Sequence, residues 1–148
     1  IPAELHQMSL HCSHERSKVL CQTLTSQLEL NEVNLVEDSA ANYILTVTSL
    51  ESSRRAVSIT NRAVTVDYEV TNNVTFNLKA SDQTIIIDNT IASARQSYQY
   101  DEDNVISKTR EEKQVKKQLD KQLASKIISR LSPYNKDRIE HIRKAQEE

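Results

Sequence analysis

The sequence contains no glycine and no tryptophan, and only one phenylalanine among its 148 residues. Glycine-rich phosphate loops and the dinucleotide-binding fingerprint need backbone conformations that only glycine adopts freely, so both are excluded. The glycine-framed nucleophile elbow of hydrolases is excluded for the same reason. Aromatic residues make up only 4% of the chain, which is poor material for stacking on nucleic-acid bases. These absences argue against nucleotide-dependent enzymes and against nucleic-acid binding.

Long hydrophobic runs and a strong net charge are also missing. No apolar run approaches the roughly 20 residues that a membrane-spanning helix needs. The formal net charge is −2 at pH 7, so no overall field attracts the chain to nucleic acid, and a site for an anion must be a local patch. The 37% of hydrophobic residues and the length of the chain are typical of one globular domain. We expect no nucleic-acid partner and no cofactor.

Alternating hydrophobic residues predict long β-strands in the middle of the chain. The clearest pattern covers residues 63–79, whose even positions hold Val64, Val66, Tyr68, Val70, Val74, Phe76 and Leu78 and whose odd positions are polar. This alternation predicts a strand with one buried face and one polar face. Similar patterns over residues 43–60, where Val47 and Val57 share a face, and from Thr84 onward predict an antiparallel meander with a turn at Asn61-Arg62.

In the third of these strands, Ile85, Ile87, Ile91 and Arg95 share the parity of the helix-covered face, whereas Tyr98 and Tyr100 fall on the opposite face.

Helical spacing is found on both sides of these strands. In residues 14–31 the apolar stripe consists of Leu20, Cys21, Leu24 and Leu28, between a short strand at residues 8–12 and an extended piece at residues 33–37. From Val105 to Leu131 an apolar residue recurs every four positions, with Asp103 or Asn104 as the cap and Ser132-Pro133 as the stop.

Together these elements predict an α+β fold. It is a two-layer sandwich with two main helices packed on one face of a mixed, mostly antiparallel four-stranded sheet with long strands. The strands are longer than the first helix, so we expect an elongated molecule with a polar sheet back. Residues 1–132 are predicted to form a single domain, and residues 133–148 a charged C-terminal tail.

Few residues are arranged for catalysis or metal binding. Asp67 and Glu69 alternate on an exposed strand face, where carboxylates are normally solvated rather than catalytic. The spacing of His6, His11, Cys12 and His14 fits no zinc pattern. We therefore expect no enzymatic activity, no catalytic residue and no metal site. Cys12 and Cys21 both fall on predicted buried positions, and they form either a disulfide or two buried thiols.

The last helix carries the strongest binding signal. Residues 105–131 hold eight basic residues against three acidic ones, and Lys113, Lys116, Lys117 and Lys121 lie close together in the sequence. Such a helix face is either simply solvated or a local surface for phosphate groups. Arg95 lies where the third strand leaves the core, and its role has two interpretations. Either its aliphatic stem packs over the apolar layer, or its guanidinium contacts an anion.

The order of elements resembles the LptE family. The resemblance rests on "IPAELHQMSLHC", the leucine-spaced helix after it, "YILTV", "DYEVTNNVTFNL", "ARQSY" and the helix that ends in "LASKIISRL", so it extends over Pro2–Leu131. It implies a non-enzymatic lipoprotein that plugs the β-barrel protein LptD, assists the assembly of that barrel and binds lipopolysaccharide. It also implies that Arg95 and Lys117 contact the lipid.

The resemblance further implies that a lipidated N-terminal cysteine anchors the full-length protein at the periplasmic face of the outer membrane. That cysteine is absent from this chain, which begins at Ile1, and we expect a trimmed form. The alternative from another class is a periplasmic structural adaptor with a similar helix-on-sheet fold and no lipid ligand.

Overall fold

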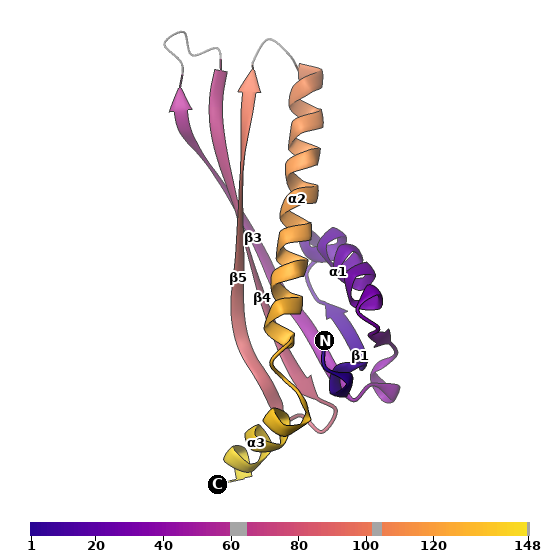
Figure 1. Cartoon of the computed structure of the whole chain (residues 1–148). Helices are drawn as coiled ribbons and strands as arrows, with labels where there is room; N and C mark the ends of the chain where they lie inside the picture. The colour runs from indigo at the N-terminus through magenta and orange to yellow at the C-terminus, as the bar shows by residue number, and fades with distance from the viewer. Residues whose placement is uncertain (60–64, 102–104, 148) are drawn as a thin grey trace.

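The computed structural model describes residues 1–59, 65–101 and 105–147, which form a mixed sheet with helices on one face (Figure 1). The elements in chain order are β1 (Gln7–Cys12), α1 (Lys18–Leu30), β2 (Asn34–Leu35), β3 (Tyr43–Ile59), β4 (Thr65–Ala80), β5 (Ile85–Asp101), α2 (Val105–Leu131) and α3 (Lys136–Glu147), with three short 3-10 turns near the N-terminus. The strand order is β2-β1-β3-β4-β5. The predicted helix-on-sheet architecture is confirmed.

The sheet has five strands, so the expectation of four is wrong. The additional strand is β2, which pairs in parallel with β1 through Gln7 opposite Asn34 and Met8 opposite Leu35. The backbone N–H of Asn34 donates to the carbonyl of His6 at 2.6 Å. Two residues are too few to show an alternation of their own, and the pairing arises because α1 returns the chain to the edge of β1.

The core lies between the helices and the inner face of the sheet. In β4 the even positions from Asn72 to Ala80 are buried and the odd positions between them are half-buried, so the predicted alternation is present, and Val74, Phe76 and Leu78 are fully buried. Leucines of α1 and the apolar residues that recur every four positions along α2 cover these side chains. The odd positions of β4 form a polar outer face.

Bulges interrupt the alternation of β3. Val47 lies opposite Phe76 and Ser49 lies opposite Thr75, so Thr48 is an extra residue, and Leu50 becomes the next buried side chain. Beyond this bulge the odd positions of β3 lie opposite the outward-facing odd positions of β4, and Val57, which stands at a second irregularity, is 48% exposed. The expectation that Val57 shares the buried face of Val47 is therefore wrong.

β5 changes face in the same way. Leu78 lies opposite Ile87 and Phe76 lies opposite Thr90, so two residues of β5, Asp88 and Asn89, face one residue of β4. Beyond this bulge the even positions turn inward, which buries the side chains of Ala92, Ala94 and Tyr98 and leaves Ile91 60% exposed.

The expectation that Tyr98 lies on the polar face is wrong as a result of this bulge. Ile85 and Ile87 do not share a face either, because Ile85 lies opposite outward-facing Lys79. The side chain of Tyr100, the turn at Asn61-Arg62 and the caps at Asp103 or Asn104 lie outside the described residues.

The molecule is elongated, because β3, β4 and β5 extend well past α1 while α2 runs beside them (Figure 1). The 13 residues of α1 cover about 20 Å, whereas the 16 residues of β4 reach about 53 Å. None of the described helices is both long and apolar enough to cross a membrane.

The segment after α2 forms helix α3. Its Ile139 is buried, and Arg143 Nη1 donates to Asp82 Oδ2 at 2.5 Å in the β4–β5 turn. The domain boundary at residue 132 stays a prediction. Because the chain has no glycine, two turns place other residues in the left-handed region, namely Glu32 with a φ of 67° and Gln83 with a φ of 74°.

Candidate functional site

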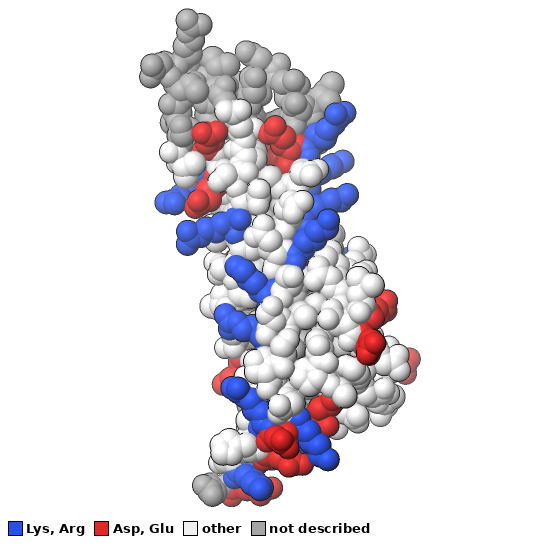
Figure 2. Space-filling model, viewed as in Figure 1, with Lys and Arg blue, Asp and Glu red and all other residues white. Residues whose placement is uncertain are grey.

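Helix α2 presents its basic residues on the sides that do not pack on the sheet. Its core side consists of Val115, Leu119, Leu123, Ile127 and Leu131, all of which are buried. The exposed cations are Arg110, Lys113, Lys116, Lys117, Lys121, Lys126 and Arg130. Figure 2 shows a row of Lys and Arg side chains that follows the length of α2. The structure therefore gathers the lysines that the sequence singles out on one surface.

Lys113, Lys117 and Lys121, called the lysine row below, follow one another at four-residue intervals. Their side chains are about 6 Å apart along the helix axis, and like charges at this spacing repel one another. None of the ion pairs of the described residues involves a member of the row. An extended anion lying along α2 would relieve this repulsion while contacting several ammonium groups as point charges.

Arg95 lies on the outer face of the sheet, and the expectation of a position on the helix-covered face is wrong. The physical reason is the bulge at Asp88 and Asn89, which reverses the alternation of β5 before Arg95 is reached. Arg95 pairs with Thr71 of β4, and its side chain is exposed. It therefore does not pack its stem over the apolar layer.

The edge of β5 lies between Arg95 and the lysine row. β5 is the last strand of the sheet, and α2 contacts it through Gln122, whose Nε2 donates to Gln96 Oε1 at 3.2 Å. The Lys126 ammonium also donates to the carbonyl oxygen of Ser93. Arg95 and Lys117 are consequently on different faces of the sheet, and the structure does not bring them into one pocket.

A cation–aromatic cluster that the sequence did not reveal lies on the helix side of the sheet. The guanidinium of Arg54 is 4.3 Å from the ring centre of Tyr68, and Arg54 Nη1 donates to the hydroxyl of Tyr98 at 3.1 Å. The two tyrosines lie directly opposite each other on β4 and β5, with ring centres 5.7 Å apart. The hydrogen bond that Arg54 donates to Tyr98 is the main cause that raises the pKa of Arg54.

The signal for this cluster was hidden by the bulges. Tyr68 has the inward parity of β4, but Arg54 and Tyr98 turn inward only after the irregularities of β3 and β5.

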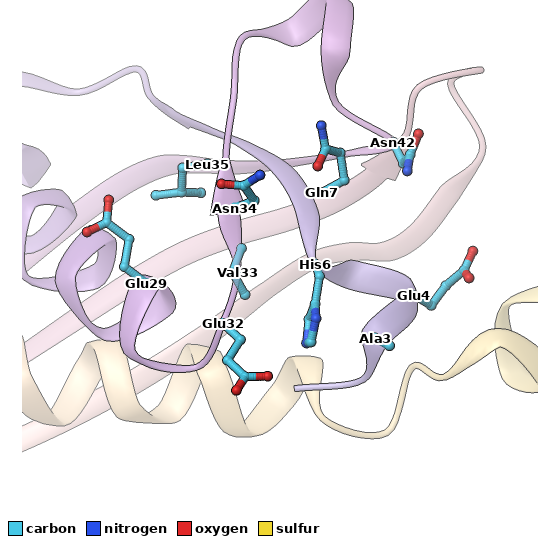
Figure 3. A pocket seen from close by; sticks show the side chains of 10 residues that line it. All are labelled: Ala3, Glu4, His6, Gln7, Glu29, Glu32, Val33, Asn34, Leu35 and Asn42. Atoms are coloured by element: carbon cyan, nitrogen blue, oxygen red, sulfur yellow. The ribbon is translucent and has the colours of Figure 1, made fainter.

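An open pocket of about 840 Å³ lies at the other end of the molecule, between the start of the chain and the loop from α1 to β2 (Figure 3). Three carboxylates line it, those of Glu4, Glu29 and Glu32. The hydroxyl of Tyr43 donates to Glu4 Oε1 at 2.6 Å, and burial followed by this bond raises the pKa of Tyr43. Its acidic lining makes this pocket unsuitable for a phosphate group.

The N-terminal histidines take part in local contacts. His6 Nε2 lies 3.0 Å from the carbonyl oxygen of Ile1, and His11 Nε2 contacts Asp38, which also accepts from Ser9 Oγ at 2.5 Å. The bonds from Ser9 and His11 lower the pKa of Asp38. Within the described part of the chain, no group of three or more His, Cys, Asp or Glu side chains is placed to hold a metal ion.

Cys12 and Cys21 form a disulfide, which decides between the two alternatives that the sequence left open. The bridge joins the end of β1 to the first turns of α1 with a Cα–Cα distance of 6.6 Å. Such a bond is typical of oxidising compartments outside the cytosol.

Comparisons with known proteins agree with this architecture. The model of a family described as LptE, lipopolysaccharide-assembly, matches residues 6–131. A minor lipoprotein from Acinetobacter baumannii is similar with a TM-score of 0.72 and 23% identity over 87% of this chain and 92% of that chain. The rare lipoprotein B from Shewanella oneidensis is similar with a TM-score of 0.71 and 24% identity over 86% of this chain and 94% of that chain.

The lipoprotein B from Nitrosomonas europaea has a TM-score of 0.67 and 12% identity over 85% of this chain and 83% of that chain. At these identities the solved structures show a shared fold. No curated protein sequence matches the chain.

Proposed function

This chain belongs to the LptE family of lipopolysaccharide-assembly proteins, and on that premise we propose that it binds lipopolysaccharide and plugs an LptD-like β-barrel of the outer membrane. The proposed role is non-enzymatic. In the full-length protein, an N-terminal lipid anchor would hold the domain at the periplasmic face of that membrane.

The proposal of lipid binding rests on the lysine row and the neighbouring Lys116. Lipopolysaccharide presents phosphate groups, and an exposed cation near an anionic lipid surface contributes about 1 kcal/mol. The row lies on a regular helix that its buried leucines fix against the sheet, so the spacing of its Cα atoms is fixed. Lys117 is the central member, and we propose that it contacts a phosphate group.

The outer face of the sheet supports the barrel role. The odd positions of β4 carry Thr71, Asn73, Thr75, Asn77 and Lys79, and β5 adds Ser93, Arg95 and Ser97. The lumen of an outer-membrane barrel is polar and wet, so a long strand face of hydroxyls, amides and charged groups matches it. Because Arg95 lies on this face, we propose that it contacts either the barrel wall or a lipid that passes around the edge of β5.

Single charge reversals separate these two roles. Lys117→Glu is expected to weaken lipopolysaccharide binding by about 30-fold, because it replaces an attraction of about 1 kcal/mol with a repulsion of similar size. Arg95→Glu is expected to reduce either lipopolysaccharide binding or co-purification with the barrel. Lys18→Glu, an exposed reversal on α1, is the matched control. Binding to lipopolysaccharide, retention of the barrel and the melting temperature are measured for each variant.

The proposal fails in its lipid part if Lys117→Glu and wild type bind lipopolysaccharide equally at low salt. It fails in its barrel part if no LptD-like barrel co-purifies with the wild-type protein. Stable binding to another envelope protein without lipopolysaccharide binding would instead support the structural adaptor.

A further inference from the structure

A second cavity lies between the inner face of the sheet and the two main helices. It measures about 600 Å³, within the range of small-ligand sites. Its apolar walls come from four elements and consist of Val19, Leu50, Val70, Val115 and Leu119. Val19 is 58% exposed, so the wall that α1 contributes is open to solvent. These walls suit an alkyl chain that enters from the side of α1.

Two buried hydrogen-bond acceptors interrupt these apolar walls. Asn72, on β4, is 7% exposed, and its Oδ1 has no hydrogen-bond partner among the described residues. Asp120, on α2, is also 7% exposed and lines the same cavity. A buried acceptor without a donor is destabilising, so a ligand that brings a donor to this position gains the free energy of a hydrogen bond.

The carboxyl group of Asp120 is buried without an ion-pair partner among the described residues. Burial raises the pKa of its carboxyl, and the charge of Lys116 one turn earlier opposes this shift. The carboxylate is therefore a strong acceptor beside the apolar walls of the cavity.

The rim of the cavity is mostly cationic. Arg16, Arg54 and Lys116 lie on it, together with the carboxylate of Glu112. Arg54 is already engaged by Tyr98 and has Glu112 nearby. Arg16 and Lys116 are exposed, and neither takes part in an ion pair of the described chain. Two cations at the entrance of an apolar cavity suit an anionic head group.

We propose that this cavity binds one alkyl chain of an anionic lipid, with a hydroxyl group of that chain donating to Asn72 Oδ1. The apolar walls hold the chain, and Arg16 and Lys116 contact the anionic head. The inference rests on the proposed function in taking the lipid to be lipopolysaccharide, and it adds the position at which one chain is held. It also gives Lys116 a role separate from that of the lysine row.

The test compares two monomeric probes, 3-hydroxydecanoate and decanoate, which differ only in the hydroxyl group. Both are titrated into the full 148-residue chain below their micelle concentrations. Dissociation constants are taken from the NMR shifts of the Val70, Val115 and Leu119 amides. One hydrogen bond predicts that the hydroxylated probe binds about threefold to tenfold more tightly.

The variant Asn72→Ala is expected to reduce this preference to less than about twofold. Asn73→Ala is the matched control, because Asn73 is the next residue of the same strand, faces outward and bonds to Ser93. It should retain the preference of the wild type. A melting curve of each variant confirms that it is folded before the titration.

Three results overturn the inference. They are equal affinity for both probes, absence of shifts at the cavity, and a preference that Asn72→Ala leaves intact. Lipopolysaccharide binding is measured on the same samples. If the wild type binds lipopolysaccharide while neither probe shifts the cavity signals, the inference is wrong and the proposed function stands. If the hydroxylated probe binds as expected and lipopolysaccharide does not, the cavity site stands and the lipid part of the proposed function fails.

Discussion

Removal of the Cys12–Cys21 disulfide should lower the stability of the protein by an amount that follows from its position in the chain. The bond closes a short loop with a sequence separation of 9. The chain-entropy relation for a loop of this size gives about 2.6 kcal/mol of stabilisation at 25 °C. For a domain of this length, that loss corresponds to a decrease in melting temperature of about 5–10 °C. The double variant Cys12→Ser with Cys21→Ser is compared with the wild type by urea denaturation and by thermal melting.

The reduced wild-type protein is the control, since it loses the same bond without a change of side chain. Reductant should shift its urea midpoint to that of the double variant and should leave the double variant unchanged. The reasoning is refuted if the double variant loses less than about 1 kcal/mol, or if reductant destabilises the double variant as much as the wild type.

Two further predictions concern the ends of the sheet. Arg54→Met should lower the free energy of unfolding by about 1 kcal/mol, because the contact with the Tyr68 ring is lost. Arg55→Met is the control: it breaks only the surface ion pair with Glu69 and should change the free energy of unfolding by less than about 0.5 kcal/mol. Equal effects in urea denaturation would contradict the structure. Bonds from Thr84 and then Arg143 lower the pKa of Asp82 from 3.8 to about 2, so the support that Asp82 gives to α3 is present above pH 4 and is lost as the pH falls towards 2. Hydrogen exchange of α3 should accelerate over that interval, and Asp82→Asn should abolish this pH dependence.

The helices and the central strand could be predicted from the sequence because their patterns are local. Leu119, Leu123 and Ile127 are all buried at the predicted four-residue spacing, and Val74 and Phe76 have the predicted parity. β4 is paired on both sides over its whole length, and the irregularities of the sheet place their extra residues in its neighbours, so its own alternation is unbroken.

The face of the sheet on which Arg95 lies could not be predicted, because a bulge depends on the pairing of two strands and not on the sequence of one strand. Three consecutive isoleucines, Ile85 to Ile87, followed by Asp88 and Asn89 give a weak signal, since no regular strand places all three on one face. The Arg54 cluster was missed for the same reason. The disulfide was left open because two candidate cysteines do not define a Cα–Cα distance.

The absence of glycine affects the denatured chain as well as the folded one. Glycine is the residue that loses most conformational freedom on folding, so a chain without it begins from a narrower unfolded ensemble. The smaller loss of conformational entropy on folding is partly offset at Glu32 and Gln83. A left-handed backbone costs roughly 1–2 kcal/mol at a residue that carries a Cβ atom. Among the described residues, these two positions are therefore the ones where a mutation to glycine would remove steric strain. At a described helical or extended position, glycine would only widen the unfolded ensemble.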